Sequence, residues 1–168
     1  MISQVSGDIL LSGAQVIAHG VAPNDDFHQG LALALREQWP ALYKDFRHYC
    51  KTTHARPGSL WTWAGPGGRR IVCLFTQEGA YGRGEKPGKA TVSYVSHALR
   101  NLRELAIRER FASLALPRLA TGVGGLQWSD VEPHIHETLG VLDIPVIVYT
   151  IYRKGVRARE NLPADSAR

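Results

Sequence analysis

Short apolar runs alternate with amphipathic stretches along most of the chain, a pattern typical of strands and helices that follow one another. Buried strands are predicted over residues 14–19, 113–116 and 145–151. A hairpin is predicted from 59–64 and 70–76, because glycine and proline fill the four positions that follow residue 64. The run 145–151 is rich in β-branched residues, which indicates a strand covered on both faces.

Apolar residues at helical spacing predict helices over 30–38, from Pro40 onward, and over 91–108. Ser129 and Glu132 have the spacing of a capping box, which predicts that a further helix begins there. Strands and helices in turn place the chain in the α/β class, and we expect a three-layer α/β/α sandwich with a central mixed sheet.

The chain has 168 residues, 44% of them apolar, which suits one globular domain. We expect this domain to span residues 1–152, with 153–168 as a polar, basic and solvated tail. No apolar run approaches the length of a membrane span and no signal-peptide segment is evident, so we expect a soluble, cytoplasmic protein that contacts no membrane. We expect it to be a monomer.

The formal net charge of +5 favours anionic partners. Several of the basic residues lie in the predicted tail, which weakens a nucleic-acid interpretation of the charge; these are Arg153, Lys154, Arg157 and Arg159. Cys50 and Cys73 fit no zinc-site spacing, and His134 and His136 lie two apart on a predicted helix and so face different sides. The sequence therefore predicts no metal site and calls for no cofactor.

The segment PRLATGVGGLQW, residues 117–128, is the most informative part of the chain. It places glycine at three positions between a buried strand and the start of a helix. Backbone N–H groups that converge beside a helix N-terminus can stabilise a diphosphate without a side-chain cation. A flexible turn between strand and helix would explain the same glycines, because short motifs are weak evidence alone.

Two further segments carry candidate chemistry. Gly7, Asp8 and Ile9 follow the first apolar stretch, and a carboxylate there can accept a hydrogen bond from an exocyclic amine. Asp8 would serve equally as a turn or capping residue. In residues 18–35, AHGVAPNDDFHQGLALAL, a strand ends in a polar loop and Gly30 opens an apolar helix, although a plain connection would have the same form.

Taken together and in this order, the three segments resemble the macrodomain family over nearly the whole chain, from Gly7 to Ile151. The resemblance implies binding of ADP-ribose. Asp8 and the Ile9 amide would then contact adenine, with Tyr149 or Tyr152 beside it, although a tyrosine in the core is an equal alternative. The distal ribose would lie against the loop that contains His19, His28, Gln29, Gly30 and Leu31, and the diphosphate against Thr121, Gly122, Val123, Gly124 and Gly125.

Within that family, the segments at 74–76 and 117–128 are similar to the branch of the terminal ADP-ribose glycohydrolase and of antitoxins that remove ADP-ribose from DNA. Where that branch has a catalytic lysine and aspartate, this sequence has Gln77 and Gly124. Glutamine cannot form a Schiff base and glycine has no acid or base, so the lysine-based mechanism is not carried over.

The run from Cys73 to Thr76, which continues into Gly82, Gly84, Glu85 and Lys86, also resembles the ADP-ribose 1″-phosphate phosphatase branch. A histidine at the end of the second strand is implicated in that branch, which would be His19 here. Imidazole can exchange a proton near neutral pH, and Asp25, Asp26 or His28 could orient it or a water. A histidine that ends a buried strand is also commonly satisfied by hydrogen bonds alone.

We therefore expect hydrolysis of an ADP-ribosylated protein or nucleic acid, which would make this an enzyme of de-ADP-ribosylation, or hydrolysis of ADP-ribose 1″-phosphate (Appr-1-p processing). The alternatives are a reader that binds ADP-ribose without turnover and a nucleic-acid module that uses the basic tail.

Overall fold

The structure is a computed structural model, and it describes residues 1–163. A single six-stranded sheet has the order β1-β6-β5-β2-β4-β3. Every neighbouring pair is parallel except β3 and β4, which form the predicted hairpin. The strands are β1 (Ile2–Gly7), β2 (Val16–Val21), β3 (Leu60–Ala64), β4 (Arg70–Phe75), β5 (Leu114–Pro117) and β6 (Val146–Tyr152).

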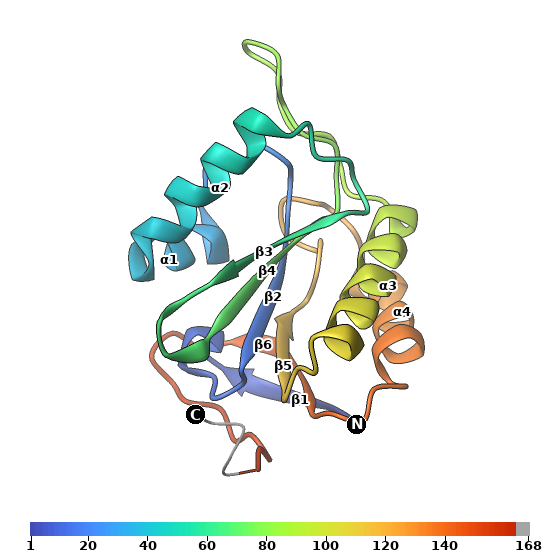
Figure 1. The fold of residues 1–168 in the computed structure, drawn as a ribbon. Helices are drawn as coiled ribbons and strands as arrows, with labels where there is room; N and C mark the ends of the chain where they lie inside the picture. Colours follow the sequence, from blue (N-terminus) through green and yellow to red (C-terminus); the bar gives the residue numbers. More distant parts are fainter. Residues whose placement is uncertain (164–168) are drawn as a thin grey trace.

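Helices cover both faces of this sheet. Figure 1 shows α1 and α2 on one side and α3 and α4 on the other. The helices are α1 (Gly30–Gln38), α2 (Pro40–Thr52), α3 (Val92–Arg108) and α4 (Trp128–Leu139), and the short 3-10 helices are η1 (Ile9–Leu11) and η2 (Pro66–Gly68). Two buried apolar clusters fill the spaces between the layers, one against α3 and α4 and the other against α1 and α2. The predicted α/β/α sandwich with a mixed sheet is confirmed.

The alternation of apolar residues in strands β2 and β4 to β6 explains these two clusters. In β2, Val16 and Ala18 join the cluster under α3 and α4, whereas Ile17 packs toward α1 and α2. Successive side chains of a strand point to opposite faces, so a strand that is buried on both faces must be apolar at almost every position. The predicted burial of the last strand, β6, holds for residues 146–149, whereas Ile151 and Tyr152 at its end are exposed.

One local prediction was wrong, and one strand was missed. The capping box at Ser129 and Glu132 does not form, because α4 begins at Trp128 and its N-cap is Gln127, which makes no side-chain capping bond. The apolar pattern also did not reveal β1, whose Ser3 and Gln4 are exposed because this strand lies at the edge of the sheet.

The chain after β6 differs from the expected solvated tail. Residues 153–163, which we call the C-terminal strap, fold back along the start of the chain (Figure 1), and the backbone N–H of Asp8 donates to the Val156 carbonyl at 2.7 Å. The basic side chains of the strap are exposed, as expected, but its backbone and Glu160 are bound to the domain. The sequence pattern missed this because the anchoring groups are polar. The last five residues of the predicted tail lie outside the described part.

The parallel strands bring three connections to one edge of the sheet. The carboxyl ends of β2, β5 and β6 lead into residues 22–29, residues 118–127 and the strap, respectively. In open α/β sheets ligands bind outside the carboxyl ends of the strands. No helix in the described part is long and apolar enough to cross a membrane.

Candidate functional site

Two adjoining cavities lie at this edge and form one groove. The first, of about 350 Å³, has a wall of polar side chains and backbone, and we call it the polar cavity. The second, of about 520 Å³, is lined mainly by apolar side chains, and we call it the apolar cavity. Both are lined by Gly30, Leu31, Pro117, Arg118 and Gly122.

The glycine loop, residues 118–127, presents bare backbone donors to the groove. Hydrogen bonds from Gly125 N to the Gly122 carbonyl (3.1 Å) and from Leu126 N to the Ala120 carbonyl (2.9 Å) fix its course. Ala120 has a φ of 60°, in the left-handed region that a residue with a side chain adopts only under constraint. Within residues 1–163, the N–H groups of residues 121–124 donate to no protein acceptor. Four adjacent free donors are the means of binding an anion.

Gly122 and Gly124 are glycines for different reasons. A Cβ on Gly124 would lie 2.7 Å from the Ala120 carbonyl oxygen and 2.9 Å from Ala90 Cβ, so no side chain fits there. A Cβ on Gly122 would meet nothing within 4 Å, because that position faces the groove. The aspartate that the resembling branch carries at position 124 is therefore excluded by packing in this chain.

The N-terminus of α1 opens into the polar cavity opposite the glycine loop. Gln29, Gly30, Leu31 and Ala32 line the cavity, and the N-cap Gln29 makes no side-chain capping bond. The first N–H groups of a helix lack intrahelical partners and carry partial positive charge. Two sets of backbone donors thus line one cavity.

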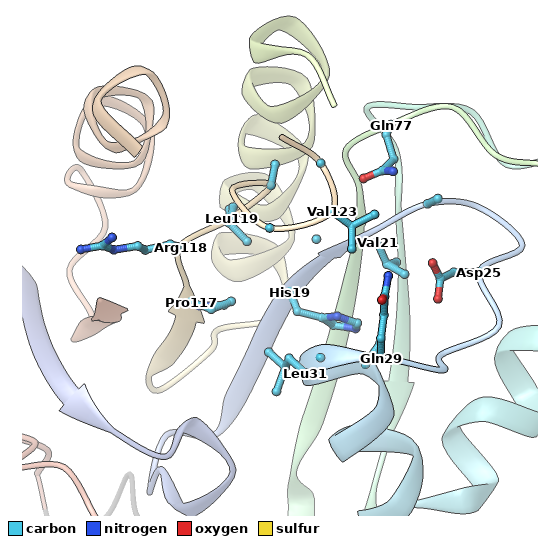
Figure 2. A pocket seen from close by; sticks show the side chains of 17 residues that line it. His19, Val21, Asp25, Gln29, Leu31, Gln77, Pro117, Arg118, Leu119 and Val123 are labelled. Atoms are coloured by element: carbon cyan, nitrogen blue, oxygen red, sulfur yellow. The ribbon is translucent and has the colours of Figure 1, made fainter. Parts of the chain in front are cut away.

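Polar side chains gather on the loop side of the polar cavity (Figure 2). Asp25 is half-buried, and its Oδ1 accepts a hydrogen bond of 2.7 Å from the Phe27 N–H. Burial raises the pKa of Asp25 above its ordinary value. Gln77 is buried, and its Nε2 donates to the Gly88 carbonyl at 2.8 Å, which leaves its Oε1 as an acceptor.

His19 lies at the floor of the polar cavity. Its side chain is buried, its Nε2 is 3.2 Å from Cys73 Sγ, and its ring meets the Phe27 ring edge-on. Burial lowers the pKa of His19 to about 4 and raises that of the Cys73 thiol. The imidazole is therefore neutral at pH 7 and is a weak base.

The structure does not bring all the predicted residues to the groove. Asp26 and His28 are exposed and pair with each other, and neither lines a cavity. Asp8 also lines neither cavity, because its Oδ1 accepts from Leu10 N (3.0 Å) and its Oδ2 from Gly155 N (2.9 Å).

Other predicted residues do face the groove. Ile9 and Tyr149 line the apolar cavity with Tyr152, while Val123 and Gly124 line the polar one. Thr121 and Gly125 shape the glycine loop without lining a cavity, and the hydroxyl of Thr121 donates to the Arg118 carbonyl at 3.0 Å.

Sequence reasoning named the segment 117–128 but gave no role to Pro117, Arg118 or Leu119, which also line the polar cavity. In Figure 2 the Arg118 side chain points away from the cavity, and its guanidinium lies 5.5 Å from the centre of the Trp128 ring. The available signal was position, because these residues directly follow the buried part of β5. Phe27 was also missed; it is fully buried with a φ of 54° and anchors the loop that carries Asp25.

Comparison with known proteins places this groove in context. No family model matches the chain. A fusion protein of Thermosipho africanus, described as a DNA ADP-ribosyl transferase and DNA ADP-ribosyl glycohydrolase, is 28% identical over 167 residues, covering 92% of this chain and 43% of that protein.

Solved structures are similar as well. The macrodomain of Thermus aquaticus DarG has a TM-score of 0.78 at 26% identity, covering 89% of this chain and 98% of that one. Thermosipho africanus DarTG, solved in complex with ADP-ribose, has a TM-score of 0.78 at 25% identity, covering 93% of this chain and 42% of that one. The chain thus spans only about two fifths of the length of the curated relatives it matches.

These similarities, with the sheet order and the helices on both faces, define the class of fold. The chain has the macrodomain fold. DNA ADP-ribosyl glycohydrolases are among its homologues.

Proposed function

We propose that this chain binds ADP-ribose in the groove and hydrolyses the bond between ADP-ribose and a macromolecule. The observation that carries the proposal is the row of free N–H groups at residues 122–124, which line the same cavity as the open N-terminus of α1. A diphosphate between them would accept several hydrogen bonds from donors that are already in place. Arg118 stacks on Trp128 instead, so the backbone carries the main part of this interaction.

The two cavities differ in their lining, and this difference indicates which end of the nucleotide would bind in each. The apolar cavity, with Ile9, Leu10 and Tyr149, suits the flat aromatic ring of adenine. The polar cavity suits the distal ribose, whose hydroxyls need the hydrogen-bonding groups of Asp25, Gln29 and Gln77. The anomeric carbon, where a linkage would be broken, then lies in the polar cavity.

Asp25 is the residue we assign to the chemistry. It lines the polar cavity, is half-buried and carries a raised pKa, which makes it a better base than an exposed aspartate. Asp25 would accept a proton from a water whose oxygen attacks the anomeric carbon. The bond to the macromolecule would break, and the same proton would pass to the leaving group.

His19 takes a different part in this scheme. Neutral at pH 7 and in contact with Cys73, it would position the ribose and not act as the principal base. Asp26 has no part, since it pairs with His28 outside the groove.

The homologues make ADP-ribosylated DNA the first substrate to test. The assay is release of free ADP-ribose from ADP-ribosylated DNA by the wild type and by Asp25→Asn. An ADP-ribosylated protein and ADP-ribose 1″-phosphate serve as competing substrates, the latter followed by release of phosphate. We expect the wild type to release ADP-ribose from DNA and Asp25→Asn to abolish this turnover. Equal rates for the two proteins would exclude Asp25 as the base.

A reader that binds ADP-ribose without turnover is the second candidate. It is favoured by Gln77, whose amide is held by the Gly88 carbonyl, and by Gly124, where no acidic side chain fits. Calorimetry with ADP-ribose separates the possibilities when it is combined with the assay above. Binding without release of product from any substrate would leave only the reader.

A further inference from the structure

The C-terminal strap is joined to the wall of the apolar cavity by a continuous set of hydrogen bonds. It continues β6 directly, and it begins with a bond from Arg153 N to the Gly7 carbonyl of β1 at 3.0 Å. The Arg157 guanidinium then donates to the Leu11 carbonyl of η1 at 3.3 Å. A Cβ on Gly7 would lie 2.8 Å from Ala158 Cβ, so the strap passes too close for any larger residue there.

Glu160 fixes the far end of the strap. Its Oε2 accepts hydrogen bonds of 2.6 Å from both the Ser12 hydroxyl and the Tyr149 hydroxyl, and its Oε1 accepts one of 2.8 Å from Gly13 N. Ser12 and Tyr149 are buried, so these bonds are sheltered from water. Hydrogen bonds to a charged group of this kind are stronger than neutral ones. One carboxylate therefore ties the strap both to β6 and to residues near the start of the chain.

The segments that Glu160 joins both line the apolar cavity. Its lining includes Tyr149, Thr150 and Tyr152 of β6 together with Ile9 and Leu10 of η1. The strap reaches η1 a second time through Asp8, which caps η1 at Leu10 N and accepts from Gly155 N of the strap. The spacing of β6 and η1 at the apolar cavity therefore depends on the strap.

We propose that Glu160 is a positioning residue for the nucleobase end of the groove, where its bonds to Tyr149, Ser12 and Gly13 hold β6 and η1 at the spacing of a flat aromatic base. This inference rests on the proposed binding of ADP-ribose. It assigns a part in ligand binding to a segment that follows the last strand and touches neither the glycine loop nor the polar cavity in any described contact.

The test compares two ligands that share adenosine, ADP-ribose and ADP, by calorimetry. In Glu160→Ala, loss of a charged hydrogen-bond acceptor should weaken both ligands by the same factor, about tenfold. An equal loss places the effect in the ADP part that both ligands share, because ADP lacks the distal ribose. Glu160→Gln keeps an acceptor oxygen and should recover most of the affinity, which a role in net charge would not allow.

Glu132→Ala is the matched control, since Glu132 lies on α4 and bonds to Gln4 away from the groove. If Glu160→Ala does not fold, Tyr149→Phe replaces it, and we expect a loss of about threefold for each ligand, because only one neutral donor is removed. Wild-type affinity in Glu160→Ala, or a loss confined to ADP-ribose, would overturn the positioning role alone. Failure of the wild type to bind ADP-ribose would overturn the proposed function, and this inference with it.

Discussion

The two loops that line the polar cavity are built in opposite ways. The glycine loop offers its main chain, with free N–H groups at residues 121–124, and its one basic side chain turns away. The loop that follows β2, residues 22–29, offers side chains, above all Asp25 and Gln29. Both are held under backbone constraint, at Ala120 and at Phe27. Under the proposed function, binding would rest on the backbone of one loop and chemistry on the side chains of the other.

The strongest test of this division removes the base from the side-chain loop. Asp25→Asn keeps the acceptor for the Phe27 N–H but loses basicity, so turnover should fall by about 10²- to 10⁴-fold, the range of general base catalysis. Affinity for ADP-ribose should change less than about twofold, because the amide can still bond to a ribose hydroxyl. The measurement pairs initial rates with calorimetry.

Asp26→Asn is the matched control, because Asp26 is the neighbouring carboxylate but points out of the groove. Its rate should equal that of the wild type. If the two variants lose activity equally, the loop acts through its overall charge and the assignment to Asp25 is wrong.

The second test fills the space that the backbone loop leaves for the ligand. Gly122→Leu places a side chain in the groove without a clash, since no atom lies within 4 Å of the added Cβ. We expect ADP-ribose affinity to fall about a hundredfold, or about 2.7 kcal/mol, while the thermal unfolding temperature stays unchanged. Undiminished affinity would show that the ligand does not pass over residue 122.

The third test changes the packing of the glycine loop against Ala90 and Ala120. In Gly124→Ala the added methyl group meets the Ala120 carbonyl and Ala90 Cβ, so the loop must shift. Overpacking of this kind costs about 1–3 kcal/mol in the free energy of unfolding, measured with urea. Gly122→Ala is the control and should cost much less, because its methyl group meets open space. Equal stability of both variants would contradict the packing argument.

The smallest expected effect is a dependence of stability on pH that arises from His19. The pKa of His19 falls from 6.5 to about 4 on folding because of burial. His19 therefore takes up a proton near pH 6.5 in the unfolded chain but only near pH 4 in the folded chain. The free energy of unfolding falls as the pH drops from about 6.5 toward 4. Between pH 7 and 5.5 this amounts to about 1 kcal/mol.

His19→Gln should remove that dependence, which urea unfolding at the two pH values would detect. The exposed His28→Gln serves as control. A slope that is unchanged in His19→Gln would mean that the buried imidazole already accepts its proton in the folded state.

Much of the fold could be predicted from local pattern. The predicted helix at 30–38 matches α1, and the long apolar stripe at 91–108 matches α3 within one residue. Strand β1 was missed because apolar and polar residues alternate only weakly in an edge strand. The predicted capping box does not form because Gln127 already occupies the N-cap position. The glycine loop was recognised because glycine is itself a signal of close backbone approach.

The chemistry of the site could not be predicted in the same way. Asp25 and Asp26 are adjacent carboxylates in the sequence, yet one lines the cavity and the other pairs with His28 outside it. Asp8 was expected at the nucleobase, but its oxygens bond to Leu10 and to the strap. Each outcome depends on the direction of a side chain, which no spacing rule fixes in a loop.

By itself, the sequence determined most of the strands and helices, the two-sided burial of the central strands and the position of a glycine-rich loop, because these follow from the periodicity of apolar residues and from the special freedom of glycine. Tertiary structure alone decided that Gly124 has no room for a side chain, that His19 is buried against Cys73, and that Glu160 reaches Ser12, Gly13 and Tyr149. These are contacts between segments far apart in the chain, and their geometry is fixed only when the whole sheet has assembled.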